Sequence, residues 1–395
     1  MKAVIVNNDF RVYWKDRLMY LHQFLASKNI DFYAIELFGK GSPYSFDVYN
    51  NSQDWWHCLF KNNSADELSK KNISDAVFAE LDKINPDIVI SSSIVFYAGA
   101  LSLRWVKKNK KKFIMFDDAR HLQVKRNMVV QAVKNLLAGQ ADGFWFPAKS
   151  YYDDYSYFHN KGIHFFYGFD CIDNRLFRNG KQKQFNNKII ICVARLVPIK
   201  NINSLLKAWK DVESAGNGYR LAIIGDGPEY DALNSQKLAV QLNTVDFLGA
   251  VSHDAIAEYY YNADALVLAS LQETWGLVVN EAMAAGLPVL LSHKINAAAD
   301  LLKEGINGFG FNPVSINEIT EALLKYINLD GSAKQSMSAN SLKIIDNLSY
   351  EKMGIQLYDA LVFITNQPVK RPGILAKTLI NAWHGRYNTA GWDKI

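Results

Sequence analysis

Two glutamates flank the start of an apolar segment, ETWGLVVNEAMAAGLPVL, at residues 273–290. The spacing of its apolar residues predicts a helix that begins near Gly276 and ends at Gly286. Glu281 then falls in the second turn of this helix, and Glu273 falls in the loop just before it. An ionised carboxylate accepts hydrogen bonds from hydroxyl groups, which suits a ribose or a hexose. The spacing therefore permits one glutamate on each of two sugars.

The predicted start of this helix is also a candidate anion site. Free backbone amides and the positive end of the helix favour negative charge around Trp275, Gly276 and Leu277. A diphosphate bound there would lie between the two sugars that the glutamates hold. The alternative is that Glu273 is an ordinary loop residue and Glu281 a partly exposed helix residue, and spacing alone does not decide between the two.

Two cations follow another buried segment, in the stretch IICVARLVPIKN. Arg195 and Lys200 come just after an expected strand, where they can neutralise a diphosphate, although a pair of surface cations in a loop is the alternative. The next expected strand is followed by Gly-Asp-Gly at 225–227. This turn lacks the third glycine of a dinucleotide-binding fingerprint. We therefore interpret it as a tight strand-to-helix connection rather than as a phosphate-binding loop.

The elements that must position these residues alternate between strands and helices. In the first half of the chain, strands are expected at 2–6, 30–37, 87–91, 112–116 and 143–146, with helices at 17–29, 74–84, 97–108 and 129–139. In the second half, strands are expected at 189–196, 219–225, 245–249, 265–269 and 288–292, with helices at 202–214, 229–240, 253–263 and 277–286. Such alternation is typical of parallel sheets with right-handed crossovers.

The sequence thus predicts an α/β protein with two Rossmann-like, doubly wound parallel-sheet domains that face each other across a cleft. We expect the first domain at residues 1–170 and the second at 187–349. The polar stretch 169–187 is interpreted as a linker. The helices expected at 350–395 pack back on the first domain.

The composition is that of a soluble globular protein, because 49% of the 395 residues are hydrophobic and 21% are charged. The cysteines Cys58, Cys171 and Cys192 have neither the spacing of a zinc site nor that of a disulfide framework. No apolar run is long enough for a signal peptide or a membrane span. We therefore expect a cytoplasmic protein.

The net charge of +5 comes from the first half of the chain, and residues 101–134 contain ten Lys and Arg against two Asp and Glu. A patch of this kind suits phosphates or an anionic membrane surface, which would bring the protein to the inner face of the cytoplasmic membrane. A solvated helix end is the alternative. A nucleic-acid partner is not expected, because no recognition motif accompanies the patch.

Four motifs in a fixed order link the sequence to a known family: VARLVPIKN, IIGDGPE, VDFLGAVSHDAIAEYYYNADALVLAS and ETWGLVVNEAMAAGLPVL. Together they resemble the C-terminal domain of the retaining glycosyltransferases of family 4 (glycosyl transferases group 1), which have the GT-B fold. The stretches ADGFWFPAKSYYDDY and YGFDCIDNRLF extend the resemblance into the first half, where it is weaker.

The resemblance implies a hexosyltransferase-type enzyme whose donor is a UDP- or GDP-sugar and which needs no bound metal. It implies that the first domain binds the acceptor and the second binds the donor. It also implies a role for each candidate residue: Arg195, Lys200, Trp275, Gly276 and Leu277 at the diphosphate, Glu281 at the ribose, Glu273 at the transferred sugar as a catalytic residue, and Phe247 and Leu248 beside the base.

The first loop of the N-terminal domain departs from the family pattern. Family members usually carry a Gly-Gly pair there, whereas this loop reads NNDFRVYWKDR and has no glycine. Asn7, Asn8, Lys15 and Arg17 are candidates to serve the same region through their side chains, and a displaced loop is the alternative. The acceptor side is therefore left open.

A second departure concerns the residue that faces the reacting sugar. The family commonly has a histidine after a later strand of the first domain, and here FIMFDDARH offers Asp117, Asp118 and His121 as catalytic candidates. A loop or helix-cap role is the alternative for each of them. Because successive side chains alternate along a strand, the two aspartates would not both point inward if the strand reached them.

The sequence therefore predicts a retaining glycosyltransferase that moves a sugar to a glycan or lipid-linked acceptor in bacterial surface polysaccharide biosynthesis. We favour attack from the same side as departure, with the departing phosphate oxygen as base. Two alternatives remain: a catalytically idle, nucleotide-sugar-binding partner subunit, and a sugar-nucleotide epimerase with the GT-B fold.

Overall fold

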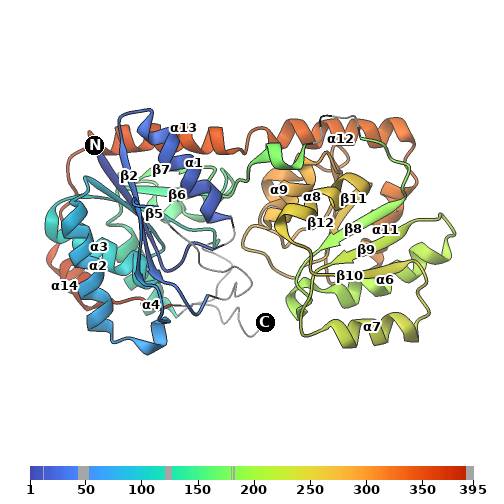
Figure 1. Cartoon of the computed structure of the whole chain (residues 1–395), viewed down its shortest axis with the longest axis horizontal. Helices are drawn as coiled ribbons and strands as arrows, with labels where there is room; N and C mark the ends of the chain where they lie inside the picture. The colour runs from blue at the N-terminus through green and yellow to red at the C-terminus, as the bar shows by residue number, and fades with distance from the viewer. Residues whose placement is uncertain (12, 43–52, 121–126, 179, 181–182, 388–395) are drawn as a thin grey trace. The chain divides into compact units, whose positions relative to one another are not determined.

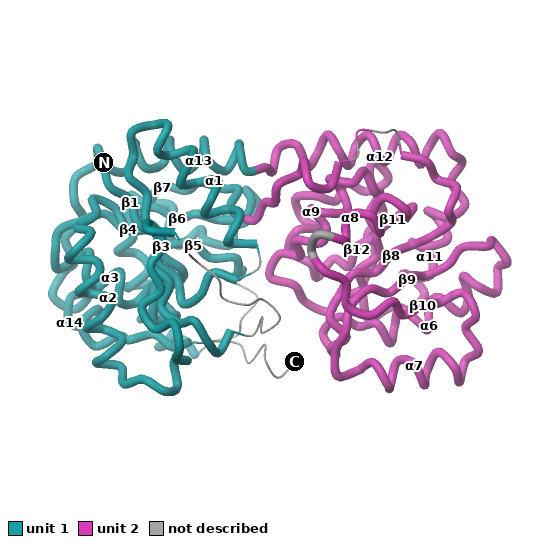
Figure 2. Tube along the Cα trace, viewed as in Figure 1, with its two compact units in different colours: residues 1–169, 350–394 teal, residues 170–349, 395 magenta. Residues whose placement is uncertain are grey.

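The computed structural model of the chain describes residues 1–11, 13–42, 53–120, 127–178, 180 and 183–387. Contacts within the chain divide it into two compact units (Figure 1, Figure 2). The first unit comprises residues 1–169 and a segment that returns from residue 350 onward, and the second comprises 170–349. The segment that follows the second unit in sequence thus belongs to the first unit.

A seven-stranded parallel sheet forms the centre of the first unit, in the order β3-β2-β1-β4-β5-β6-β7. Because β1 pairs with both β2 and β4, the direction of strand succession reverses between β1 and β4. Ligands of doubly wound sheets bind beside the carboxyl ends of the strands at such a point. The strands span β1 Lys2–Asn7, β2 Asp31–Phe38, β3 Trp56–Phe60, β4 Ile88–Ser92, β5 Lys112–Phe116, β6 Gly143–Phe146 and β7 His164–Tyr167.

Helices cover both faces of this sheet (Figure 1). One group consists of α1 and α13, which contact each other, and the other consists of α2, α3, α4 and α14. These helices and one short helix span α1 Trp14–Ala26, α2 Lys70–Ile84, α3 Tyr97–Asn109, α4 Met128–Ala138, α5 Tyr151–Asp154, α13 Tyr350–Thr365 and α14 Ile374–Ala382. The returning segment therefore supplies one helix to each face.

The second unit has a six-stranded parallel sheet in the order β10-β9-β8-β11-β12-β13. Its strands span β8 Ile189–Val193, β9 Arg220–Ile224, β10 Val245–Gly249, β11 Ala265–Leu268, β12 Val289–Ser292 and β13 Gly308–Phe311. Its helices span α6 Ile202–Ser214, α7 Tyr230–Ala239, α8 His253–Asn262, α9 Leu277–Ala284, α10 Ala298–Leu301, α11 Ile316–Ile327 and α12 Gly331–Ile345. Two parallel, doubly wound sheets are thus present, as the sequence predicts.

Three edge strands are absent from the sequence prediction, and each has a physical reason. β3 and β7 close the two edges of the first sheet, and they are short and only partly buried, unlike the fully buried central strands. β13 reads GFGF, a composition that normally disfavours a strand. Gly308 is required there, because a Cβ at this position would lie 1.7 Å from the carbonyl oxygen of Val289 on β12.

The stretch that the sequence suggests as a linker begins with ordered residues of the second unit. Asn174 and Phe177 are buried, and Asn174 Nδ2 donates to the carbonyl oxygens of Ile345 and Leu348 at 3.2 and 3.3 Å. Residues 170–178 therefore pack with the second unit, and the linker interpretation of 169–187 stays a prediction. Asn174 thus bonds to the second unit, whereas Arg175 and Arg178 are exposed.

No helix within the described ranges combines the length and the hydropathy that crossing a membrane requires.

Candidate functional site

The loop that carries Glu273 is fixed by a neighbouring segment, residues 294–297. The amide of Glu273 donates to Lys294 O at 3.3 Å, and the amide of Asn296 donates back to Glu273 O at 3.4 Å. Asn296 Nδ2 adds a bond of 2.8 Å to Thr274 O. In the Glu273 loop these bonds use backbone atoms, so the Glu273 carboxylate bonds to other partners, of which Ser270 Oγ lies at 3.3 Å.

Helix α9 begins where the sequence predicts. Gly276 precedes it with a φ of +101°, a value that favours glycine, and Leu277 is its first residue. Trp275 is buried, and its Nε1 donates to Asn280 Oδ1 at 3.0 Å. Among the described residues, the amides of Gly276 and Leu277 have no hydrogen-bond acceptor. The first turn therefore offers two donors beside the positive helix end.

Lys200 and Glu273 form an ion pair in which both side chains are largely buried. Lys200 ends a short 3-10 helix, η5 Pro198–Lys200, and Asn201 follows it with a φ of +57°. Asn201 Nδ2 donates to Ala269 O at 3.1 Å, which ties this turn to the loop after β11. The structure thus brings together a cation and a carboxylate that are 73 residues apart in sequence.

Arg195 is exposed, and the loop that carries it rests on the Gly-Asp-Gly turn. A Cβ on Gly225 would lie 1.8 Å from Ala194 O, and a Cβ on Gly227 would lie 2.4 Å from Leu196 O. The amide of Leu196 also donates to Asp226 O at 2.9 Å. The two glycines therefore permit a close backbone approach, as expected for a structural turn.

Glu281 lies inside the second unit with only 2% of its surface exposed, and Tyr260 Oη donates to its Oε2 at 2.8 Å. The alternative of a partly exposed helix residue is therefore wrong. A buried carboxylate requires hydrogen-bond donors, and Tyr260 on α8 is a donor that sequence reasoning missed. Its neighbour Asn280 is also buried and donates to Asp170 O at 2.9 Å, which fixes the rotation of α9.

The two residues predicted beside the base lie on β10, one of the two edge strands of the second sheet. Phe247 is half-buried and contacts the ring of Tyr230 edge to face, with 5.7 Å between centroids. Leu248 is 43% exposed, next to an irregularity in the pairing of β10 with β9. An apolar surface is thus available there, and its role beside a base stays a prediction.

Asp117 and Asp118 follow β5 in the first unit, and both are half-buried. Asp117 Oδ1 accepts from the amide of Ala119 at 3.0 Å, so this carboxylate shapes its own loop. The carbonyl of Asp118 accepts from Tyr151 Oη at 2.9 Å. Sequence reasoning missed Arg120, which pairs with Asp154 at 2.6 Å. His121 lies outside the described residues, and a catalytic role of these three residues stays a prediction.

The first loop of the first unit bonds to a charged residue of strand β2 that sequence reasoning overlooked. Glu36 on β2 is fully buried, accepts from the amide of Phe10 at 3.0 Å and lies 3.5 Å from the guanidinium of Arg11. Burial raises the pKa of Glu36 to about 7, although the Phe10 amide and Arg11 oppose this shift. A glutamate inside the apolar strand DFYAIELF was the available signal.

Two of the four loop residues that the sequence proposed are also buried. Asn8 Oδ1 accepts from the amide of Ala98 at 3.1 Å, and Arg17 packs over the ring of Trp14 at 5.3 Å. Lys15 is exposed, and Asn7 Nδ2 donates to Asp9 O at 2.8 Å. Asn8 and Arg17 therefore support the loop, and any role toward a ligand stays a prediction.

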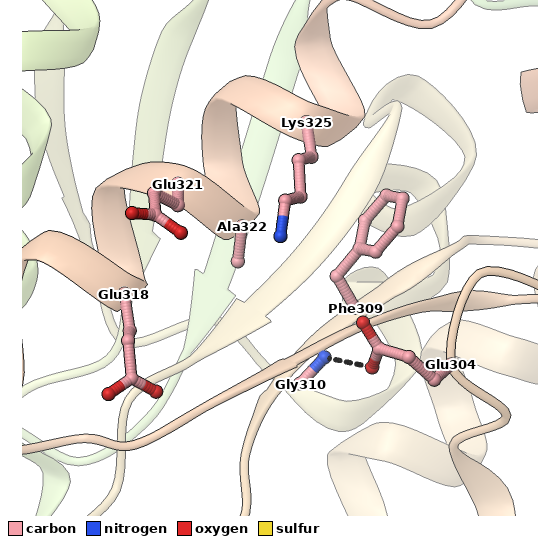
Figure 3. Close-up of a pocket in the computed structure, with 7 residues that line it drawn as sticks. All are labelled: Glu304, Phe309, Gly310, Glu318, Glu321, Ala322 and Lys325. Carbon is pink, nitrogen blue, oxygen red and sulfur yellow. Dashed lines mark hydrogen bonds between the residues drawn. The ribbon is translucent and has the colours of Figure 1, made fainter.

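A pocket elsewhere in the second unit contains none of the predicted site residues (Figure 3). Two of its carboxylates have local partners: Glu304 accepts from the amide of Gly310 at 2.8 Å, and Glu318 accepts from the amide of Asn312 at 2.9 Å. Across the described ranges, His, Cys, Asp and Glu side chains form no group of three that is able to hold a metal ion.

Solved structures resemble this chain over most of its length. The lipopolysaccharide outer core galactosyltransferase WaaB, in its apo form, aligns with a TM-score of 0.67 and 17% identity, covering 92% of this chain and 99% of WaaB. Anabaena HepE in complex with UDP-glucose aligns with a TM-score of 0.69 and 16% identity, covering 92% of this chain and 100% of HepE. This likeness defines the class of fold, and the predicted GT-B fold is confirmed.

A comparison with sequence families is more specific than the comparison of folds. Residues 173–343 match the model of the family described as glycosyl transferases group 1, so this part of the chain belongs to that family, as the four motifs predict. The alpha-monoglucosyldiacylglycerol synthase of Acholeplasma laidlawii is 34% identical over 128 residues, which are 31% of each chain. The chain spans about half the length of the first curated relatives it matches.

Proposed function

We propose that the protein is a retaining glycosyltransferase of family 4 that uses a UDP- or GDP-sugar as donor. The observation that carries this proposal is the ion pair between Lys200 and Glu273 directly ahead of α9, with Glu281 buried in the same helix. A cation, free helix amides and two carboxylates are the groups that a sugar diphosphate needs. The family of residues 173–343 and the UDP-glucose bound to HepE support the same donor class.

Each group has a distinct task in the proposed donor complex. The ammonium of Lys200 has three N–H donors, so it bonds to Glu273 and to a phosphate oxygen at the same time. Arg195 and the amides of Gly276 and Leu277 bind the remaining phosphate oxygens. Glu273 accepts from hydroxyls of the transferred sugar, and Glu281 accepts from the ribose.

The proposed reaction proceeds on one face of the sugar. The bond between the anomeric carbon and the phosphate oxygen breaks, and the acceptor oxygen bonds to the anomeric carbon from the same side. The proton of the acceptor hydroxyl passes to the departing phosphate oxygen, which yields a nucleoside diphosphate and retains the anomeric configuration. Arg195, Lys200 and the helix end stabilise the leaving group, so no metal ion is needed.

The acceptor in this proposal is a glycan or a lipid-linked glycan of bacterial surface polysaccharide synthesis, reached at the inner face of the cytoplasmic membrane. The name of WaaB, a lipopolysaccharide galactosyltransferase, supports a surface glycan. Lys108 is exposed at the end of α3 and suits anionic lipid, whereas Lys107 and Lys112 are buried near Asp142. Flotation with phosphatidylglycerol vesicles tests the membrane contact, and recovery in the soluble fraction at low salt contradicts it.

A second candidate is a nucleotide-sugar-binding subunit without activity of its own. The glycine-free first loop, with its buried Asn8 and Arg17, favours this candidate. Slow hydrolysis of the donor separates the two. An enzyme releases free nucleoside diphosphate from the UDP- or GDP-sugar that it binds, and a binding subunit releases none.

Thermal shifts with UDP, GDP and their sugars test the division of roles, because a ligand that binds the folded protein raises Tm. Glu281→Ala is expected to weaken binding of the bare nucleotide about tenfold or more, since a hydrogen bond to a charged group is lost. Glu273→Ala should instead reduce the extra shift that the sugar adds. Glu321→Ala, an exposed residue of α11, is the control. Equal losses of both responses in both variants contradict the proposal.

A further inference from the structure

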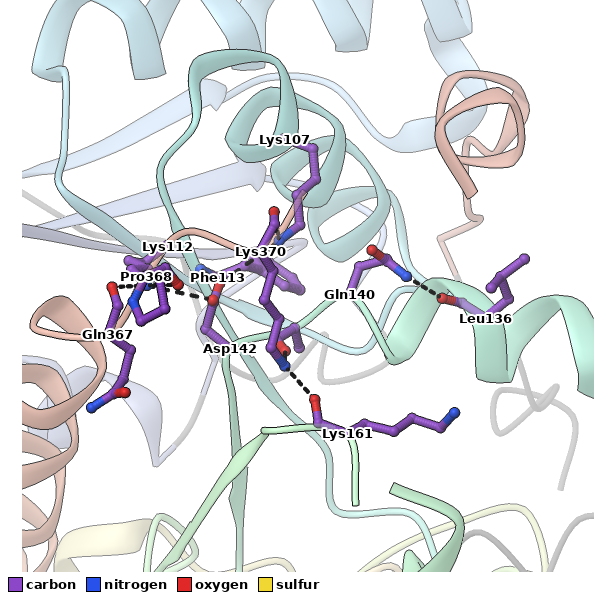
Figure 4. Close-up of polar contacts among 11 residues, drawn as sticks. Lys107, Lys112, Phe113, Leu136, Gln140, Asp142, Lys161, Gln367, Pro368 and Lys370 are labelled. Atoms are coloured by element: carbon purple, nitrogen blue, oxygen red, sulfur yellow. Dashed lines mark hydrogen bonds and ion pairs between the residues drawn. The ribbon is translucent and has the colours of Figure 1, made fainter. Parts of the chain in front are cut away.

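The returning end of the chain forms a strap, residues 367–387, that is fixed at both ends to the first unit. At the amino edge of the sheet, Lys112 Nζ donates to the carbonyls of Gln367 and Pro368 at 2.7 and 2.8 Å (Figure 4). Lys370 Nζ donates to Ala141 O at 2.7 Å. Asp142 is buried and lies 3.7 Å from Lys112, which balances part of the charge.

Helix α14 then carries the strap along helices α3 and α4. Ala376 and Ile380 are its buried residues. Arg104 on α3 holds the end of the helix, because its Nη2 donates to Trp383 O at 2.7 Å and its Nε donates to Ile380 O at 3.2 Å. The strap is therefore directed toward the carboxyl ends of the strands.

At the carboxyl edge, the strap attaches to the loop after β4. Trp383 Nε1 donates to Ile94 O at 2.6 Å, and the amide of Arg386 donates to Val95 O at 3.0 Å. Gly385 approaches so closely that a Cβ would lie 2.3 Å from Phe96 O, and its φ of +71° favours glycine. This contact is specific in shape and in backbone geometry.

Tyr387 then reaches the first loop, which follows β1. Its Oη donates to Asp9 Oδ2 at 3.0 Å, and Asn8 Nδ2 donates to its carbonyl at 3.0 Å. Its ring packs edge to face on Phe38, with 5.5 Å between centroids. Burial and the nearby carboxylate of Asp9 raise the pKa of Tyr387, so its hydroxyl stays protonated and remains a donor. The last turn of the strap and the first loop therefore hold each other.

The position of this contact gives it a functional meaning. The loop lies beside the reversal between β1 and β4, where doubly wound sheets bind their ligands. For the proposed glycosyltransferase, the family resemblance implies that this first unit binds the acceptor. We propose that the strap sets the conformation of the first loop for acceptor binding, and that Tyr387 is a positioning residue that acts through Asp9. The inference thus rests on the proposed function and extends it to the chain's end.

Two variants test this inference on the full chain. Tyr387→Phe removes only the hydroxyl that bonds to Asp9, and Gly385→Ala disturbs the docking on Phe96. Gly373→Ala is the matched control at the other end of α14, where a Cβ meets nothing within 4 Å. Acceptor probes are octyl glycosides of glucose, galactose, mannose and N-acetylglucosamine, and the best of these is used for kinetics.

Tyr387→Phe should raise the acceptor KM about tenfold, the effect of losing a hydrogen bond to a charged group. Gly385→Ala should also raise the acceptor KM, because it displaces the strap from Phe96, and both variants should leave donor hydrolysis unchanged. Hydrogen exchange of peptides covering residues 5–11 should become faster in both variants and stay unchanged in Gly373→Ala. The double variant of Tyr387→Phe with Asp9→Asn should be no worse than either single change.

The inference is overturned by unchanged exchange in the first loop, by a parallel loss of donor hydrolysis, or by faster transfer, which would identify the strap as an inhibitor. The exchange measurement needs no turnover. If the protein neither hydrolyses nor transfers a sugar, the proposed function is disproved. If the variants nevertheless show faster hydrogen exchange at residues 5–11, the contact between the strap and the first loop is still established.

Discussion

The loops that follow the first strands of the two sheets are held in opposite ways. After β8, the loop with Arg195 is fixed by backbone contacts with the turn at Gly225 and Gly227. After β1, the loop is fixed by side chains such as Asn8 and by the remote Tyr387. A loop that is fixed by backbone contacts has its side chains available for a ligand. A loop that is fixed by side-chain hydrogen bonds uses its polar side chains to hold its own conformation.

This difference also explains which loop the sequence reveals. Close backbone approach requires glycine, so the loop after β8 is accompanied by a recognisable Gly-Asp-Gly turn within about one α/β repeat. The loop after β1 has partners up to 379 residues away. A local motif does not show such a partner, and the comparison predicts different sensitivities to mutation in the two units.

Gly225→Ala should break the backbone-held loop and give the largest effect. A Cβ would lie 1.8 Å from Ala194 O at a φ of +140°, so we expect the free energy of unfolding to fall by about 3 kcal/mol or more. Urea unfolding measures this loss. Gly331→Ala at the start of α12 is the control, because its Cβ meets nothing within 4 Å. Similar stabilities of the two variants would show that the turn is less rigid than described.

Glu36→Gln tests the loop after β1, because Glu36 bonds to the Phe10 amide of this loop. The variant should change how the stability of the protein depends on pH. Burial raises the pKa of Glu36 from 4.5 to about 7. The folded chain therefore binds this proton more tightly than the unfolded chain, and stability present below pH 4.5 is lost as the pH rises toward 7. The loss amounts to about 2 to 3 kcal/mol.

Urea unfolding at a series of pH values checks this expectation. The unmodified protein should lose stability between pH 4.5 and 7, and Glu36→Gln should lack that component because glutamine does not titrate. Glu351→Gln, at an exposed position of α13, should keep it. An identical pH profile in Glu36→Gln and the unmodified protein would assign the titration to another group.

Lys108→Ala should have the smallest effect on stability, within about 0.5 kcal/mol, because this lysine is exposed. Its binding to phosphatidylglycerol vesicles should still weaken about fivefold at low salt. Lys112→Ala makes the contrast, since that buried ammonium holds two carbonyls of the strap, and it should lower stability by about 1 to 3 kcal/mol. Equal stability losses in both variants would remove the distinction between surface and structural lysines.

The fold was largely predictable because strand and helix periods are local properties of the sequence. The start of α9 was placed correctly near Gly276, since glycine at positive φ and the apolar spacing agree there. The strand β13 was missed because Gly308 is required by its close contact with Val289 of β12, and this contact exists only in the folded sheet. The short edge strands β3 and β7 lack the buried run that signals a central strand.

The candidate site was predictable only where the residue and the element that positions it belong to the same sequence motif. Glu273 and Glu281 share a segment with their helix, but the bonds to Lys200 and Tyr260 connect different α/β repeats. Asp117 illustrates the reverse problem, because its carboxylate bonds to the amide two residues on. Sequence alone did not distinguish a residue that shapes a loop from one that faces a ligand.

The return of the chain to its first unit has a consequence for biosynthesis. Helix α13 and the strap leave the ribosome only after the whole second unit, residues 170–349, has been made. At ordinary rates of translation this delay is on the order of 10 to 40 s. During that time the first unit lacks α13, which packs on α1 and β7, and α14, which packs on α3 and α4. A chaperone that binds apolar surfaces therefore has its clearest target in the first unit, because the second unit already has all of its segments.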